Sequence, residues 1–311
     1  MTLQRSQITN LSGDSAIECL MGRMIDYAGL FPPASLSMQQ AVASYFSYLR
    51  SEYRWVLGRF IVPAQRLAEF ESALDATDTV SRCCNLSILL GPDPQADVDH
   101  IGQFNARRAS LNSGTKVVIE SVEGKASNPD EVLRLDAVIP HELLAYFELP
   151  LSGRLYESIA GVEDGSRRGL KIRMGGETAD KFPASEAVME FLRFCVSAGL
   201  PFKATAGLHH PVRSIHRLTH EPDSASATMH GFLNLFLGAA FLRAGMDDAL
   251  AFDVLNETLG TAFRFDEEGV WWREHRLSAR ELFLARRDFA ISFGSCSFTE
   301  PVDDLRSLHL L

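Results

Sequence analysis

Lysine is scarce in this sequence. Of the 30 basic residues only five are lysines, namely Lys116, Lys125, Lys171, Lys181 and Lys203. Lys171 and Lys203 lie inside short apolar runs that each end in glycine, L-K-I-R-M-G-G and F-K-A-T-A-G. A buried ammonium is costly without a partner, whereas a lysine amine, unlike a guanidinium, can become neutral and nucleophilic. The placement indicates a chemical role for these two lysines, with snorkelling or salt-bridged lysines as the alternative.

Other features are missing as well, and each absence excludes a class of protein. No stretch approaches 18 uninterrupted apolar residues, and the first residues carry no apolar signal region, so we expect neither export nor a membrane span. The five cysteines form no C-x-x-C pair, which favours reduced thiols in a cytoplasmic protein. A net charge of −10 argues against nucleic acid and anionic membranes as partners. The sequence leaves open whether the protein forms a homo-oligomer.

The chain alternates apolar strands with helical segments. Strands are expected at 55–62, 85–90, 116–121, 145–150, 170–174 and 202–206, and a seventh where M-H-G-F-L-N-L-F begins, although a wholly helical reading is open there. Either I-D-Y-A-G-L-F or F-A-I-S-F-G-S-C-S-F can supply the eighth. This pattern predicts an α/β protein, a single (β/α)8 TIM-type barrel over residues 1–311, with F-R-F-D-E-E-G-V-W-W-R as a C-terminal hairpin insertion. An open doubly wound sheet is the runner-up, but no G-x-G-x-x-G follows the first strand.

Active residues of such a barrel lie at the C-terminal ends of the strands and in the loops beyond. Side chains alternate along a strand, so Lys171 shares a face with Arg173, and Lys203 shares a face with Thr205. Three converging cations are expected to lower the pKa of a lysine amine towards neutrality. The polar residues predicted for the strand ends and the following loops are Arg59, Glu120, Glu148, Lys171, Arg173, Lys203, Thr205, His209 and His210. Asp26, ahead of a double proline, is interpreted as a turn or cap residue.

From these residues we predict catalytic roles for Lys171, Lys203, His209 and Glu148. Substrate binding is assigned to Arg173, Gly175, Gly176, Thr205, His210 and Arg59. The same cations and the Gly175-Gly176 turn can instead form a simple clamp for a carboxylate or phosphate. No cofactor is expected on this interpretation. An alternative is a divalent metal site built from His209, His210 and His230 with Glu148 or Glu120, although the spacing matches no compact ligand motif.

The two lysine segments resemble the paired lysine strands of the deoxyribose-phosphate aldolase family, a class I aldolase barrel. In that family the first lysine forms a Schiff base and the second depresses its pKa. The resemblance covers about 45 residues and implies the first role for Lys171 and the second for Lys203. It departs from the family pattern at Arg173 and Met174, and at Leu208-His209-His210. No counterpart of the family's proton-shuttling aspartate can be placed.

The sequence thus predicts an aldolase-type lyase that acts on a small anionic carbonyl compound through a Schiff-base lysine. Two alternatives remain open. One is a metal-dependent lyase, isomerase or hydrolase that uses the His and Glu residues at the barrel mouth. The other is a barrel that binds small anions without catalysis.

Overall fold

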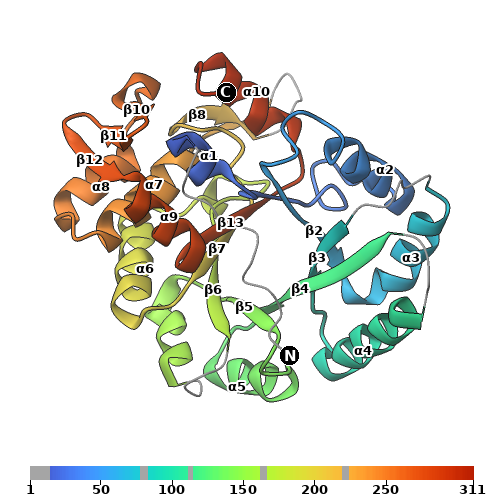
Figure 1. Cartoon of the computed structure of the whole chain (residues 1–311). Helices are drawn as coiled ribbons and strands as arrows, with labels where there is room; N and C mark the ends of the chain where they lie inside the picture. The colour runs from blue at the N-terminus through green and yellow to red at the C-terminus, as the bar shows by residue number, and fades with distance from the viewer. Residues whose placement is uncertain (1–14, 78–82, 111–114, 162–166, 219–223) are drawn as a thin grey trace.

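The computed structural model describes residues 15–77, 83–110, 115–161, 167–218 and 224–311, which form a closed barrel of eight parallel strands surrounded by helices (Figure 1). Neighbouring strands pair in parallel all the way round, and β1 and β13 close the ring. The barrel strands are β1 (Ile25–Tyr27), β2 (Leu57–Pro63), β3 (Cys83–Leu89), β4 (Lys116–Lys125), β5 (Leu144–Glu148), β6 (Arg168–Arg173), β7 (Phe202–Thr205) and β13 (Ala290–Ser295). The predicted (β/α)8 barrel is confirmed.

Several helices, such as α3 and α6, bury one apolar face and expose the other to solvent. Ser37 caps the N-terminus of α2 and forms a capping box with Gln40. The helix α6 ends at Gly199, whose φ of 64° is the left-handed conformation favoured by glycine. The helices are α1 (Ala16–Met21), α2 (Met38–Tyr48), α3 (Leu67–Asp75), α4 (Pro94–Ser110), α5 (Pro129–Val138), α6 (Ser185–Ala198), α7 (Phe232–Arg243), α8 (Asp248–Asn256), α9 (Ala279–Asp288) and α10 (Thr299–Ser307).

The predicted seventh strand is wrong, and the helical reading left open for this segment is confirmed from Phe232 onward. Phe232 to Leu242 are all buried within the helix α7, and the residues just before it, β9 (Ser226–Met229), pair antiparallel with β8 (Ser214–Arg217) outside the barrel. A helix that is apolar all round shows no 3.6-residue period, so its sequence is easily mistaken for a strand. Both candidate segments for the eighth place are therefore barrel strands, β1 at one end of the chain and β13 at the other.

Two predicted strand ends are also wrong. The strand β4 continues past Ser121 to Lys125, which places Glu120 in its middle, and Arg59 is the third residue of β2 rather than its last. In β4 the register shifts next to Leu86 and Ser87 of β3, so Glu120 lies at a bulge. The sequence does not show an apolar run in this part of the strand, because Ser121 and Glu123 are polar and their side chains face a polar barrel interior.

The predicted hairpin is confirmed and gains a third strand. β10 (Phe263–Asp266) pairs with β11 (Gly269–Trp272), which pairs with β12 (His275–Ser278). Gly269 has a φ of 151°, and a Cβ there would lie 2.1 Å from the carbonyl oxygen of Leu277. Among the described residues, none of the helices is long and apolar enough to cross a membrane.

Candidate active site

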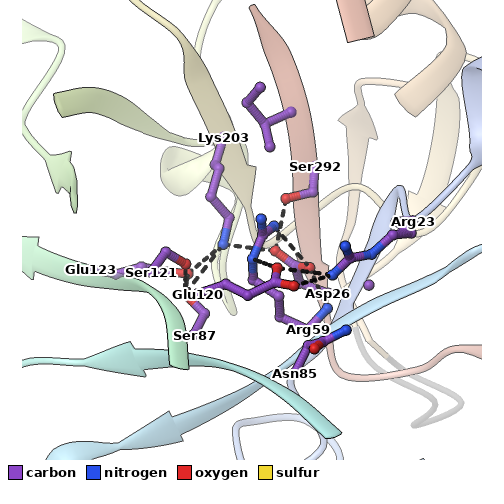
Figure 2. A network of polar contacts seen from close by, with 12 residues as sticks. Arg23, Asp26, Arg59, Asn85, Ser87, Glu120, Ser121, Glu123, Lys203 and Ser292 are labelled. Carbon is purple, nitrogen blue, oxygen red and sulfur yellow. Dashed lines mark hydrogen bonds and ion pairs between the residues drawn. The ribbon is translucent and has the colours of Figure 1, made fainter. Parts of the chain in front are cut away.

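The interior of the barrel holds a chain of alternating positive and negative side chains. Lys203 of β7 lies between two carboxylates, with its Nζ atom 2.7 Å from Asp26 Oδ2 and 2.5 Å from Glu123 Oε1 (Figure 2). Ser292 donates a hydrogen bond to Asp26 Oδ2 at 2.7 Å, and Ser87 donates one to Glu123 Oε1 at 2.6 Å. All of these side chains are almost completely buried. Lys203 is therefore fixed in place between two carboxylates, which it shares with Lys171 and Arg59.

Lys171 of β6 continues the chain of charges from Glu123 to Glu148. Its Nζ atom lies 2.8 Å from Glu123 Oε2 and 2.9 Å from Glu148 Oε2, so Glu123 bridges the two lysines. Glu148 in turn accepts a hydrogen bond from Arg173 Nε at 3.0 Å. The side chain of Lys171 is 6% exposed, whereas that of Arg173 is 43% exposed. Lys171 is thus nearly buried, and its contacts lead through Glu148 to the more exposed Arg173.

The register of the strands produces this arrangement. Lys203 pairs with Lys171, and Lys171 pairs with Glu148, so three charged residues on three adjacent strands lie at one level. Alternation turns their neighbours Leu170, Ile172, Phe202 and Ala204 outward, where they are buried. The expectation that Lys171 and Lys203 lie on adjacent parallel strands is confirmed.

Glycines make room for the charged interior at two positions. A Cβ at Gly58 would lie 2.3 Å from Asp26 Oδ1, which instead accepts a hydrogen bond from the Arg59 backbone N–H at 2.7 Å. A Cβ at Gly169 would lie 2.8 Å from the ring of Tyr146, which is buried inside the barrel with Lys203 Nζ 5.4 Å from its ring centroid. Larger residues at these two positions would displace Asp26 and Tyr146.

The ion pairs decide the protonation of the site. Burial alone would raise the pKa of Glu123, but the charges of Lys171 and Lys203 outweigh it and hold the pKa well below its usual range. The pKa of Asp26 and that of Glu148 are lowered in the same way, chiefly by Lys203 and by Lys171 respectively. Burial would likewise lower the pKa of Lys171, yet Glu123 and Glu148 outweigh it and raise the pKa. The predicted lowering of this pKa by converging cations is therefore wrong, because two carboxylates contact the amine.

These shifts predict how stability depends on pH. The pKa of each of these carboxylates is lower in the folded protein than in the unfolded chain, where it is 4.5 for Glu and 3.8 for Asp. Such a carboxylate stabilises the fold fully at any pH above its unfolded pKa, and this stabilisation is lost as the pH falls through the lower, folded pKa. Lys171, with its raised folded pKa, contributes stability until pH rises above its ordinary value of 10.5. We expect the free energy of unfolding in urea to be level between about pH 5 and 9 and to fall steeply below about pH 4.5.

The control variants for this prediction are Glu148→Gln and Glu190→Gln, the second at an exposed position of α6. Glu148→Gln should make the acid limb shallower because one depressed carboxylate is gone, whereas Glu190→Gln should leave the limb unchanged. An unfolding free energy that stays level down to pH 3 contradicts the assigned ion pairs.

Arg59 and Glu120 belong to a second part of the same network. Arg59 Nε lies 2.9 Å from Glu120 Oε2, and Arg23 reaches the same carboxylate at 2.8 Å. The Arg59 guanidinium is 3.8 Å from Asp26 Oδ1, which links this part to Lys203. Both residues were expected at strand ends, Arg59 as a substrate-binding residue and Glu120 as an alternative metal ligand, and the structure pairs Glu120 with Arg23 and Arg59, and Arg59 with Asp26.

The glycine turn after β6 has a packing explanation. A Cβ at Gly175 would lie 2.6 Å from Phe182 and 2.7 Å from Gly207 Cα, and a Cβ at Gly176 would lie 2.9 Å from Lys181. The loops after β6 and β7 therefore touch at Gly175 and Gly207. Thr205 pairs in register with Arg173, which places it on the level above the two lysines.

The histidines of the loop after β7 contact carboxylates of α10, and among the described residues neither ring hydrogen-bonds to Lys171 or Lys203. His209 Nδ1 lies 3.0 Å from Glu300 Oε2, and His210 Nδ1 lies 2.6 Å from Asp304 Oδ2. His230 is buried, and its Nε2 donates to the Pro183 carbonyl at 2.9 Å. Over the part of the chain that the structure describes, no group of three or more His, Cys, Asp or Glu side chains is arranged to hold a metal ion. The residues proposed as metal ligands are not gathered in one place.

Asp26 and Glu123 are the two central residues that the sequence did not reveal. Asp26 was interpreted as a turn or cap residue, and this is wrong, since it is a fully buried strand residue bound to Lys203. Glu123 lay beyond the predicted end of its strand. A signal was present in β4, where Ser121, Glu123 and Lys125 alternate with apolar residues or glycine and so share one face.

Comparisons of the chain with protein-family models, with curated proteins and with solved structures each return no match. The function therefore has to be argued from the chemistry of this site.

Proposed function

We propose that the protein is a carbon–carbon lyase of the aldolase type, in which Lys171 forms a Schiff base with a small anionic carbonyl compound. One observation carries the proposal: Lys171, nearly buried, lies between two carboxylates that can take and return its protons, and one of them, Glu148, contacts the more exposed Arg173. Lys203, enclosed by Asp26 and Glu123 and 1% exposed, is less accessible to a substrate. Arg173, which is more exposed and hydrogen-bonded to Glu148, suits the substrate's anionic group.

The raised pKa of Lys171 determines the first step, because the free protein holds an ammonium at this position. Glu148, at 2.9 Å, accepts one proton, and the neutral amine then attacks the carbonyl carbon. A proton moves from the new N–C–O⁻ adduct's nitrogen to its oxygen, and Glu148 returns its proton to that oxygen, which leaves as water. The product is an iminium ion, and Glu148 is again a carboxylate. The iminium accepts the electron pair of the bond between its α and β carbons, as aldol cleavage requires.

The second carboxylate beside Lys171, Glu123, also supports the proposal. It contacts both lysines, so a change of charge on Lys171 alters the ion pair between Glu123 and Lys203. Lys203 therefore acts as a fixed positive charge next to the reacting amine, and its presence favours loss of the Lys171 proton. The resemblance to the deoxyribose-phosphate aldolase family proposes the same division of roles between the two lysines.

The test is borohydride trapping followed by peptide mass mapping. The protein is incubated with pyruvate, with acetaldehyde and with a ketose phosphate as probes, and a reduced adduct is expected on Lys171. Because the ammonium must first lose a proton, the trapping rate should rise as pH is increased from 7 towards 10. An adduct on Lys203 alone reverses the assignment.

The second candidate, a barrel that binds small anions without covalent chemistry, is favoured by the raised pKa of Lys171 itself. An ammonium fixed between carboxylates, beside Arg173, can act as a charge clamp. It predicts saturable binding of a keto acid, measured by calorimetry, with no trapped adduct on any lysine at any pH.

A further inference from the structure

A histidine and a glutamate connect the segments that follow two adjacent barrel strands. His209 lies four residues after the end of β7, and Glu300 lies in the first turn of α10, which follows β13. Strands β7 and β13 are neighbours, so both residues belong to the C-terminal side of the barrel. Their contact, 3.0 Å from His209 Nδ1 to Glu300 Oε2, is made by side chains that are 21% and 35% exposed. Solvent and a small molecule can therefore reach the pair.

The contact fixes the tautomer of His209. An ionised carboxylate can only accept a hydrogen bond, so the hydrogen of the neutral imidazole resides on Nδ1. Nε2 then carries the lone pair. Within the described residues, no hydrogen bond occupies His209 Nε2, whereas Nδ1 is held by Glu300. The arrangement leaves a positioned proton acceptor at Nε2.

The loop that carries His209 is packed against the loop that carries Arg173. A Cβ at Gly207 would lie 2.7 Å from both Gly175 Cα and the Met174 carbonyl oxygen. The guanidinium of Arg173 lies 3.5 Å from the Gly175 carbonyl oxygen. His209 is two residues from this junction on one side, and Arg173 is two residues from it on the other. The acceptor and the substrate-anchoring cation therefore lie on touching loops at the mouth.

The neighbouring pair of His210 and Asp304 resembles the pair of His209 and Glu300, but its histidine ring is also stacked on another ring. The ring of His210 stacks on His216, with centroids 3.4 Å apart and planes 11° from parallel. His216 is fixed by Ser214, whose Oγ lies 2.5 Å from its Nε2. One face of the His210 ring is thus covered, and its carboxylate contact ties the loop to α10. This second pair provides a structural control for the first.

We propose that His209 is the base that takes the substrate's hydroxyl proton during carbon–carbon cleavage, with Glu300 as its positioning residue. The proposal rests on the Schiff base at Lys171. The substrate O–H bond breaks and an N–H bond forms at His209 Nε2, while the oxygen's electrons form the new carbonyl. The C–C bond breaks, and its electron pair neutralises the iminium to give an enamine. The imidazolium, stabilised by Glu300, then returns its proton to the enamine carbon.

The first arm of the test needs no substrate. Long-range ¹H–¹⁵N NMR of protein labelled in its histidines, with resonances assigned by His209→Gln and His210→Gln, reports the tautomer of each ring. In the wild-type protein His209 is expected as the Nδ1–H form. Glu300→Gln should admit the Nε2–H form, because an amide can donate to Nδ1, and Glu300→Asp should restore the original tautomer. Asp304→Asn should alter His210 and leave His209 unchanged.

The second arm uses a ketose phosphate with a hydroxyl group on the carbon β to its carbonyl, because pyruvate and acetaldehyde carry no hydroxyl for the base to deprotonate. Glu300→Gln should form the Lys171 adduct at the wild-type level and lose turnover by about 10²-fold or more, because the proton acceptor is misplaced. Glu300→Asp should recover part of that turnover, and Asp304→Asn should stay within about threefold of wild type. Either His209 in the Nε2–H form in the wild-type protein or wild-type turnover in Glu300→Gln overturns the inference. A missing Lys171 adduct together with the Nδ1–H tautomer refutes the proposed function and the proton-transfer step that rests on it, and leaves the His209–Glu300 geometry intact.

Discussion

Replacing Glu123 with glutamine is expected to destabilise the protein by about 3–5 kcal/mol, the usual cost of removing one partner from a buried ion pair. The carboxylate bridges Lys203 at 2.5 Å and Lys171 at 2.8 Å, and it also accepts a hydrogen bond from Ser87. Glutamine has a similar shape, so the loss is one of charge rather than volume. The ammonium groups of Lys171 and Lys203 would each lose one of their two carboxylate partners, and burying them in charged form would then cost more free energy. Urea unfolding at pH 7, analysed for the unfolding free energy and its slope, measures the effect.

The matched control is Glu120→Gln. Glu120 sits in the same strand and contacts two arginines, but it is 21% exposed, so water can replace part of what is lost. We expect this variant to lose clearly less than Glu123→Gln. A loss of less than about 1 kcal/mol for Glu123→Gln contradicts the bridging role assigned to this carboxylate.

A charged barrel interior needs a reason beyond stability. The interior of a TIM barrel is usually filled with layers of branched apolar side chains. Here Asp26, Glu123, Lys171 and Lys203 occupy that space instead, and the ion pairs they form are no more stabilising than well-packed apolar residues of equal volume. Charges retained at such a cost are typical of a functional site. This argument favours chemistry at Lys171 over a purely structural network, and it is independent of any resemblance to a known family.

The fold could be predicted from the sequence because each barrel strand carries its own local signal. Short apolar runs, such as the one around Ile172, alternate with helices whose period is clear, such as α6. The prediction failed at α7, whose residues are apolar on every side, and at the closure of the ring. The pairing of β1 with β13 joins Asp26 to Gly294, far apart in the sequence, and no local pattern encodes it.

The site could be predicted only in part, for a related reason. Lys171, Lys203 and Glu148 were expected close together, and they are, since neighbouring strands place them in register. Their partners Asp26 and Glu123 come from strands elsewhere in the ring, and only closure of the barrel brings them to the lysines. The direction of the Lys171 pKa shift was predicted wrongly because the cations were visible in one segment and the carboxylates were not.

Lys171→Leu is expected to abolish the borohydride-trapped adduct and to lower turnover by about 10⁴-fold or more, the scale seen when a covalent nucleophile is removed. Lys203→Leu should behave differently. It leaves Glu123 with Lys171 as its only lysine partner, so the Lys171 ammonium is held more firmly and its pKa rises further. The adduct should still form on Lys171, more slowly at neutral pH, and the pH–rate profile should shift to higher pH. Turnover and trapping are measured on both variants from pH 6 to 10.

Lys181→Leu is the matched control, because this lysine is 59% exposed on the short helix η3 (Ala179–Lys181), beside the glycine turn, and its Nζ lies 3.4 Å from Asp180. Its turnover should equal that of the wild type, which excludes a general effect of removing a lysine near the mouth. Each variant is first checked for cooperative unfolding, since both buried lysines hold carboxylates whose loss of a partner costs stability. A folded Lys171→Leu protein that keeps its turnover would show that the reaction does not pass through a Schiff base on this residue. A folded Lys203→Leu protein with an unshifted pH profile would leave Lys203 as a structural counter-ion of Asp26 and Glu123.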